Sequence, residues 1–365
     1  MLISGDVFDV ANPSSESRRV YFDLLRELMV LQCKVIITGG NHDSPAMLEA
    51  PGELLKHLDI HVTGSLDTDS DGMLVPVCNK QGGTELVVAA IPYLRDADLR
   101  QYQRDDTYED RLETVRKGIA SVYHQAAEVC SAQYPGIPAI AMGHLFVQGC
   151  FTSESERDIQ VGNMAGLDSD SLPDYFSYYA LGHLHKPQEP GGKFVYSGAP
   201  VQLSFSESRN RNSMVLITAD QGSLTHERVS VPVNRRLIRL EGTVQQLAQK
   251  LVACTPREGE LPDFIELIAK EVQHDPAKLL QLEDLIENFP GGSATILKYR
   301  MQFANGSVGT ASLYDDTQHI SDMKPEDVFI RRIEKEGLEE HTRDMLLDAF
   351  RQILQEVEQT EGDEA

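Results

Sequence analysis

Four histidines of this 365-residue chain stand directly behind short apolar runs, in clusters with glycine or asparagine. The clusters are Asn41-His42, Gly143-His144 and Gly182-His183-Leu184-His185. A single histidine behind a strand is more often a structural or surface residue than a ligand. Glycine, however, lets the backbone turn sharply off a strand end, and His-x-His spacing sends both rings to one side of an extended segment. The repeated pattern therefore favours a ligand-binding site.

Two further residues behind such apolar runs supply oxygen donors. Asp6 offers a carboxylate that can bridge two cations, and Asn41 offers a neutral amide oxygen. Imidazole, carboxylate and amide together suit divalent ions such as Mn²⁺, Fe²⁺ or Zn²⁺ better than Ca²⁺ or a thiolate site. Two such ions about 3.5–4 Å apart can hold a phosphate and activate water for in-line attack. These donors thus predict phosphate ester chemistry at a two-metal site.

Short apolar runs must position these clusters, at residues 1–4, 35–38, 139–142 and 178–181. Continuous apolar runs of this length suit strands that are buried on both faces. Amphipathic stretches at 17–31 and 108–130 separate the runs and predict helices. We therefore expect a layered α/β core with its polar residues at the carboxyl ends of the strands, where open α/β sheets bind ligands.

The pattern changes after residue 232. Residues 233–323 predict a small α+β domain with the order strand, helix, strand, helix, strand. Residues 324–365 predict C-terminal helices and an acidic tail. One helical face there is apolar and contains Leu346, Phe350, Ile353, Leu354 and Val357. The expected domains are therefore 1–232, 233–323 and 324–365.

The ordered motifs GDVFD, GNHD, GH and GHLH, at 5–9, 40–43, 143–144 and 182–185, resemble the calcineurin-like metallophosphoesterase superfamily. Further segments are similar to the SbcD-type nucleases, which are subunits of bacterial SbcCD complexes. These segments are IPYLR at 91–95, RDI at 157–159, YSGAP at 196–200 and LSFSE at 203–207. The resemblance implies a β-sheet sandwich flanked by helices, a small capping domain and C-terminal helices that bind a partner.

The resemblance also implies metal-binding roles. Asp6 would bridge two divalent ions, with Mn²⁺ expected. Asn41, His144 and His183 would complete the site of the second ion, and His185 would bind the first.

Catalytic roles follow from the same motifs. His42 matches the family's catalytic histidine, which contacts the phosphate and protonates the leaving oxygen. Asp9 matches the acid that orients this imidazole. For Asp43 we favour a cap or turn role.

One family motif, Asp-x-His, is missing ahead of Asp6. The triplet Asp59-Ile60-His61 lies downstream of GNHD and is misplaced for that role. We therefore expect an N-terminally truncated nuclease domain, through a real truncation or a misassigned start. The first metal site would then keep only Asp6 and His185, which leaves the activity of this chain in question.

The charge of the chain bears on its substrate. There are 33 Lys and Arg against 57 Asp and Glu, a net charge of −24, whereas proteins that bind DNA alone are usually basic. Either the substrate is not a polyanion, or metals and a partner supply the positive field. Candidate contacts to the DNA backbone flank the motifs and are Arg95, Arg157, Lys186 and Arg209.

The favoured function is a metal-dependent DNA phosphodiesterase, a double-strand exonuclease and single-strand endonuclease. The resemblance implies an ATP-dependent complex that acts in DNA repair, recombination and replication. An SbcC-type ATPase would bind the C-terminal helices, with a homodimer of this chain inside a heterotetramer. The alternatives are a calcineurin-like phosphoesterase of a small substrate and an inactive, truncated binding subunit. Five scattered cysteines and no membrane-length apolar run predict a cytoplasmic protein.

Overall fold

The computed structural model describes residues 1–50, 52–66, 70–99, 107–152, 156, 166–220, 222–254, 261–272, 275–291, 294–303, 346–347 and 350. Within these ranges, no helix has the length and apolar character needed to cross a membrane. Two compact units are present. The first comprises Met1–Leu240, Val252–Leu267 and Pro290–Lys298, and the second comprises Glu241–Leu251, Ile268–Phe289 and the described part of Tyr299–Ala365. The domain boundaries expected at 232 and 323 stay predictions.

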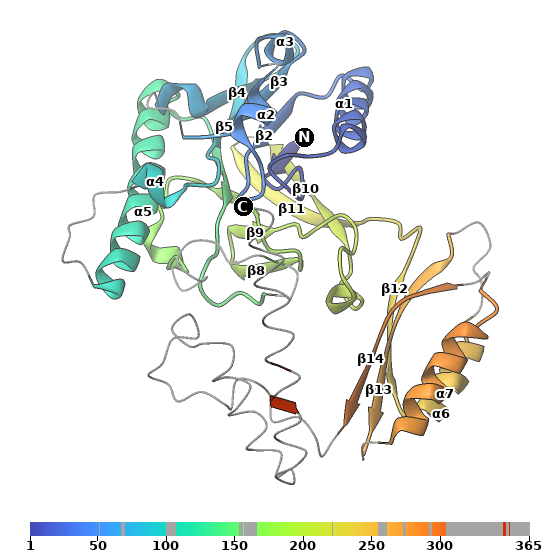
Figure 1. Cartoon of the computed structure of the whole chain (residues 1–365). Helices are drawn as coiled ribbons and strands as arrows, with labels where there is room; N and C mark the ends of the chain where they lie inside the picture. Colours follow the sequence, from blue (N-terminus) through green and yellow to red (C-terminus); the bar gives the residue numbers. More distant parts are fainter. Residues whose placement is uncertain are drawn as a thin grey trace, which may run out of the picture. The chain divides into compact units, whose positions relative to one another are not determined.

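Two sheets form the centre of the first unit (Figure 1). The smaller sheet is parallel and has the order β1 (Leu2–Ser4), β2 (Val35–Thr38), β3 (Ile60–Thr63). The larger sheet has the order β4-β5-β6-β7-β9-β8. Its strands are β4 (Leu74–Cys78), β5 (Thr84–Ala90), β6 (Ala139–His144), β7 (Tyr178–Gly182), β8 (Gln188–Gly191) and β9 (Phe194–Tyr196). The inner strands β5, β6, β7 and β9 run parallel, while β4 and β8 are antiparallel edges.

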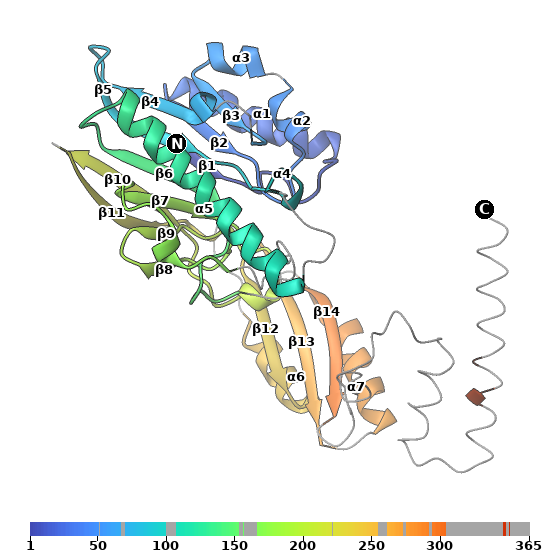
Figure 2. The same ribbon diagram turned by 90° about the vertical axis from the view of Figure 1, so that its left-hand side faces the viewer.

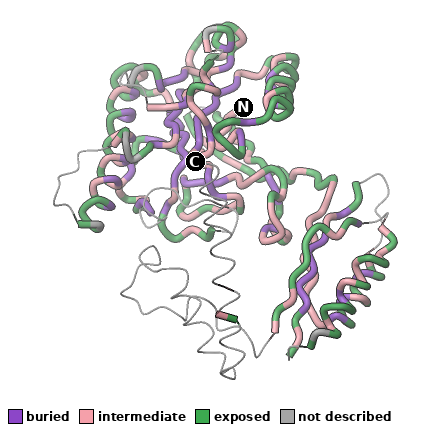
Figure 3. The backbone as a smooth tube through the Cα atoms, in the orientation of Figure 1, coloured by how far each residue is buried: buried purple, intermediate pink, exposed green. Residues whose placement is uncertain are grey.

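Alternate residues of the strands face different cores, as the pleat of a strand requires. In β2, Val35 and Ile37 pack toward helix α1 (Ser15–Val30), whereas Ile36 packs against Val88 and Met142 of the larger sheet. Every residue of β2 and of β6 is buried, and buried residues follow the strands of both sheets in Figure 3. The expected layered α/β core is confirmed, with β2 and β6 buried on both faces, whereas all three residues of β1 are only partly buried.

Helices cover the outer faces of the two sheets. Helices α1, α2 (Pro45–Glu49) and α3 (Gly52–His57) pack on the smaller sheet. Helix α5 (Tyr108–Gln133) runs along the larger sheet (Figure 2). Its side chains, such as Ile119 and Tyr123, belong to the buried core beneath it. Helices α1 and α5 begin at capping residues, because Ser14 accepts from Ser17 N and Thr107 forms a capping box with Asp110. The helix expected from residue 17 therefore begins two residues earlier.

The elements after residue 232 agree with the expected order, whereas the hairpin before them has no counterpart in the expectation. Strands β10 (Ser213–Asp220) and β11 (Ser223–Ser230) form an antiparallel hairpin that packs on the larger sheet. Strands β12 (Leu237–Gly242), β13 (Asp263–Glu271) and β14 (Ala294–Phe303) form a sheet in that order. Helices α6 (Val244–Val252) and α7 (Pro276–Glu287) alternate with these strands along the chain, as expected. Short helices are α4 (Asp96–Leu99), η1 (Ser70–Met73), η3 (Ser169–Ser171) and η4 (Phe205–Glu207).

Candidate metal centre

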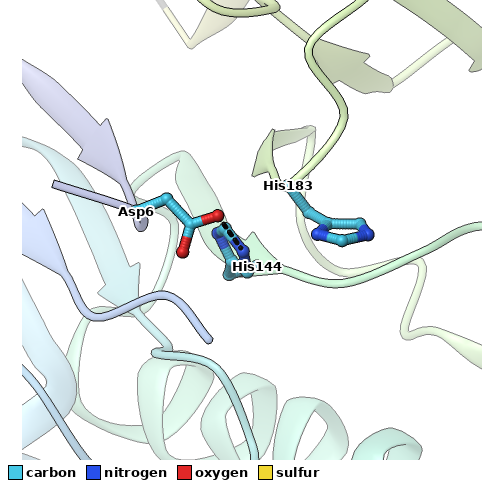
Figure 4. Close-up of side chains that lie close together, drawn as sticks. All are labelled: Asp6, His144 and His183. Atoms are coloured by element: carbon cyan, nitrogen blue, oxygen red, sulfur yellow. Dashed lines mark ion pairs between the residues drawn. The ribbon is translucent and has the colours of Figure 1, made fainter. Parts of the chain in front are cut away.

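Parallel strands bring distant segments together at the carboxyl ends of both sheets. Asp6 follows β1, Asn41 follows β2, His144 ends β6 and His183 follows β7. The potential ligand atoms of Asp6, His144 and His183 all lie within 4.8 Å of one another (Figure 4). Three of the predicted metal ligands therefore meet at one point.

Sharp turns make this convergence possible. Asp6 and His183 both have positive φ angles, 50° and 89°, a region that side chains rarely adopt and that is often found at functional sites. Close packing requires glycine nearby, since a Cβ on Gly40 would collide with Asp6 and one on Gly182 would collide with the Ser4 carbonyl. The glycines of the motifs thus allow the backbones to approach.

His144 is held in one orientation by residues at the strand ends of the smaller sheet. Its Nδ1 lies 2.9 Å from the Ser4 carbonyl oxygen and donates a proton to it. Its Nε2 lies 2.9 Å from Asn41 Oδ1 and 3.2 Å from Asp6 Oδ2. Burial would by itself lower the pKa of His144, but the Asp6 carboxylate, together with the Ser4 carbonyl and Asp43, raises that pKa. Three potential ligand atoms from three strand ends therefore surround one point.

His183 supplies the observation that tests whether a cation fits. Its side chain is buried, and its Nε2 has no hydrogen-bond partner among the described residues. Buried polar atoms are rarely left unsatisfied. Burial first, and then the positive charge of His144, lower the pKa of His183 to about 3. A neutral imidazole is the form that binds a metal, so the residues present fit a divalent ion.

Asp6 is ionised in this cluster. Burial alone would raise its pKa, but His144 and a hydrogen bond from His42 N (3.1 Å) lower it to about 2. An ionised, partly buried carboxylate between imidazoles is a suitable ligand for a cation.

His42 lies beside Asp6 and is held by Asp9. Its Nδ1 is 2.7 Å from the Asp9 carbonyl oxygen and 3.6 Å from the Asp9 carboxylate, whose side chain is 90% exposed. The backbone of Asp9, rather than the carboxylate that we expected, makes the closer contact to the ring.

Asp43 has the turn role that the sequence favoured. Its carboxylate accepts hydrogen bonds from the backbone N–H groups of Val7, Phe8 and Gly40, at 3.1, 2.9 and 2.8 Å. Burial raises the pKa of Asp43 despite these bonds. This side chain fixes the loops after β1 and β2 to each other.

His185 lies outside the group of three close ligands, and its partner is a residue that we had not assigned. Its Nδ1 is 2.7 Å from Glu207 Oε1, and its backbone N–H donates to Glu156 Oε1 at 2.8 Å. Burial would lower the pKa of His185, but the Glu207 carboxylate, together with Glu156 and Asp6, raises that pKa. The motif that contains Glu207 was visible in the sequence, but its spacing gave no sign of this contact.

The remaining predicted residues are at the surface or outside the described chain. Arg95, Lys186 and Arg209 are exposed, and Lys186 Nζ lies 4.8 Å from the centroid of the Phe151 ring. Arg157 is outside the described residues. The triplet at Asp59 lies at the amino end of β3, because Val35 pairs with Ile60 in the parallel ladder, and so it cannot join the cluster at the carboxyl ends.

Comparison with known proteins identifies relatives. No family model matches the chain. It is 29% identical over 362 residues to the SbcD subunit of the SbcCD nuclease of Escherichia coli, a match that covers 97% of this chain and 87% of that protein. The SbcD subunit of Rhodobacter capsulatus is 34% identical over 256 residues (67% and 62% of the two chains), and that of Bacillus subtilis is 31% identical over 227 residues (61% and 56%). The chain is thus similar to SbcD subunits along nearly its whole length, and these matches support an SbcD-type nuclease.

Proposed function

We propose that this chain is the metal-dependent DNA phosphodiesterase of an SbcCD-type complex. Its activities would be double-strand exonuclease and single-strand endonuclease, dependent on ATP hydrolysis by the partner, in DNA repair, recombination and replication. The observation that carries the proposal is the convergence of Asp6, His144 and His183 with an unsatisfied buried Nε2. The names of the relatives support the substrate class and the complex.

The ligand roles expected from the motifs complete the proposed site. Asp6, Asn41, His144 and His183 would hold one divalent ion, and Asp6 with His185 would contribute to a second. Mn²⁺ fits this set of nitrogen and oxygen donors. When bound, the ions would neutralise the phosphate and activate a water molecule.

The chain's own residues would position the reaction and move a proton. His42 is fixed at two points, since its backbone N–H donates to Asp6 and its Nδ1 lies against the Asp9 carbonyl. With Nδ1–H held there, a protonated ring directs its second proton, on Nε2, to the leaving oxygen. The Asp9 carbonyl thereby selects which ring nitrogen acts as the acid.

The partner interactions extend this proposal. An SbcC-type ATPase would bind the apolar face that begins at Leu346 and Phe350, an amphipathic helix in a groove. Ile353, Leu354 and Val357 of the same face lie outside the described residues. The net charge of −24 favours an arrangement in which the ATPase supplies much of the basic surface for DNA. A homodimer within a cytoplasmic heterotetramer completes the proposal.

The test uses the purified chain with Mn²⁺, alone and with an SbcC partner and ATP. The substrates are linear duplex DNA, single-stranded DNA and a generic small phosphodiester. Metal-dependent cleavage of DNA that is lost in His144→Ala supports the proposal. Hydrolysis of the small ester with intact DNA would favour the small-substrate enzyme, and bound metal without hydrolysis would favour a binding subunit.

A further inference from the structure

The loop after β9 presents a buried carboxylate to His185. Glu207 Oε1 lies 2.7 Å from His185 Nδ1, and the Glu207 side chain has 0% of its surface exposed. The other oxygen, Oε2, accepts from Leu203 N at 3.0 Å. Burying a carboxylate costs free energy unless partners compensate it. His185 and the backbone of the loop itself are therefore among the partners that compensate this buried carboxylate.

The backbone of His185 is fixed to the same loop. The His185 carbonyl accepts from Ala199 N at 2.9 Å, while its N–H donates to Glu156. Gly198 has a φ of 79°, and a Cβ there would lie 2.7 Å from the His185 carbonyl oxygen. The loop therefore packs closely against the backbone of His185 as well as against its ring.

His144 offers a comparison within the same centre. Its Nδ1 donates to the Ser4 carbonyl, a neutral acceptor, whereas Nδ1 of His185 faces a carboxylate. In both cases ligation of a cation has to use Nε2. A carboxylate partner raises the basicity of an imidazole ligand as well as fixing its tautomer.

From these contacts we infer that Glu207 is a positioning residue, which accepts the Nδ1 proton of His185 and so directs the lone pair of Nε2 to a divalent ion. This inference rests on the proposed function, because it assumes that His185 is a ligand. It gives the LSFSE segment a specific role, which is to hold a ligand of the first ion, the ion for which the fewest ligands were found in the sequence.

Binding of Mn²⁺ alone to the full chain tests the inference by isothermal titration calorimetry. Glu207→Ala should weaken the binding that depends on His185 by about 10–100-fold, as loss of such a partner does at other metal sites. Glu207→Gln keeps a neutral acceptor and should lose less. In a double-mutant cycle, Glu207→Ala should cause no further loss once His185→Ala is present. If Glu207→Ala does not fold, Glu207→Gln and its own cycle with His185→Ala take its place.

Additive losses in that cycle would overturn the inference, because a purely structural carboxylate acts whether or not the imidazole is there. Wild-type affinity in the folded Glu207 variants would overturn it too. The matched control is Glu266→Gln, which alters a carboxylate with 1% exposure in the β12–β14 sheet; it should lower thermal stability and leave Mn²⁺ affinity unchanged. If the wild type binds no Mn²⁺, the proposed function itself fails. If the wild type binds Mn²⁺ but the losses are additive, only the role of Glu207 fails.

Discussion

Two regions of this chain hold buried or partly buried acidic side chains, and they differ in what faces each acid. In the β12–β14 sheet, Asp263 and Glu266 are buried, and each has its own guanidinium. Arg236 Nε lies 3.0 Å from Asp263 Oδ1, and Arg239 Nε lies 2.6 Å from Glu266 Oε2. A buried carboxylate matched by a permanent cation is a self-contained structural feature.

The strand-end cluster is built differently. Asp6 faces His144, whose charge depends on protonation, and His183 Nε2 is without a partner among the described residues. The cluster therefore contains potential ligand atoms that are not satisfied by the described residues, and Asp6 does not face a permanent positive charge. The difference teaches that burial of an acidic side chain does not by itself indicate a ligand-binding site. A buried polar group whose partners are incomplete is the better indication.

The largest effect is expected from a substitution in the strand-end cluster that leaves the proposed metal ligands unchanged. His42→Ala should reduce DNA cleavage by about 10²–10⁴-fold, the usual worth of a general acid, with metal content unchanged. The rate is followed in single-turnover assays and the metal by elemental analysis. Asp9→Asn is the matched variant and should lose much less activity, because the Asp9 carbonyl that holds the ring is kept. Loss of metal in His42→Ala would show that the residue is a ligand instead.

The pH dependence of the free energy of unfolding should next reveal the contribution of the strand-end cluster. The pKa of His183 is about 3 in the folded chain and near 6.5 when unfolded, so the folded state binds fewer protons between these values. His183 therefore adds stability above pH 6.5 that is lost as the pH falls toward 3. In a chelator, urea unfolding of the wild type should lose about 1.4 kcal/mol per pH unit from this group.

His183→Gln serves as the reference for that titration. The stability difference between wild type and variant should move against the wild type as the pH falls from 6.5 to 4. A difference that stays constant over this range would mean that His183 is not held neutral by the fold.

Removing a guanidinium from the β12–β14 sheet should lower stability moderately. Arg239→Ala leaves Glu266 with a weaker partner, Lys298 at 3.7 Å, and should lower the free energy of unfolding by about 1–3 kcal/mol. Urea unfolding measures the loss. Mn²⁺ affinity should remain that of the wild type; a change in affinity without a change in stability would break the distinction between the two regions.

The smallest effect is expected from cations that are at the surface. Lys186→Gln and Arg209→Gln should each weaken duplex binding modestly and reduce the slope of log affinity against log salt by about one. Fluorescence anisotropy measures this in a His42→Ala background, which prevents cleavage. Lys80→Gln, an exposed lysine in another turn, is the control. If all three variants had equal slopes of log affinity against log salt, Lys186 and Arg209 would not be contacts to the DNA.

The sequence predicts the centre of the fold well, because its signals are local. Apolar runs ending in Gly5, Gly143 or Gly182 mark strand ends, and parallel strands bring their carboxyl ends to one edge. The hairpin β10–β11 was not predicted. Intermediate and exposed residues alternate in only part of each strand, and the last three residues of both are exposed. Such largely exposed strands are placed by tertiary packing more than by composition.

The partners of the site residues could not be read from the sequence, for the same reason. Glu207 reaches His185 across a turn whose geometry depends on Gly198 and on packing against the strand. The use of the Asp9 carbonyl in place of its carboxylate depends on backbone direction after β1. Residue type indicates what a side chain can do, while its partner is decided by contacts distant in the sequence.

The division of the cluster between two sheets has a mechanical consequence. Asp6 and Asn41 follow strands of the smaller sheet, whereas His144 and His183 belong to the larger one. An ion bound by all four would be a cross-link that closes the chain between residues 6 and 183 and restricts the unfolded ensemble much as a long-loop disulfide does. Ion release would then loosen the seam between the sheets, so resistance of the β1 segment to proteolysis should report the state of the centre without any substrate.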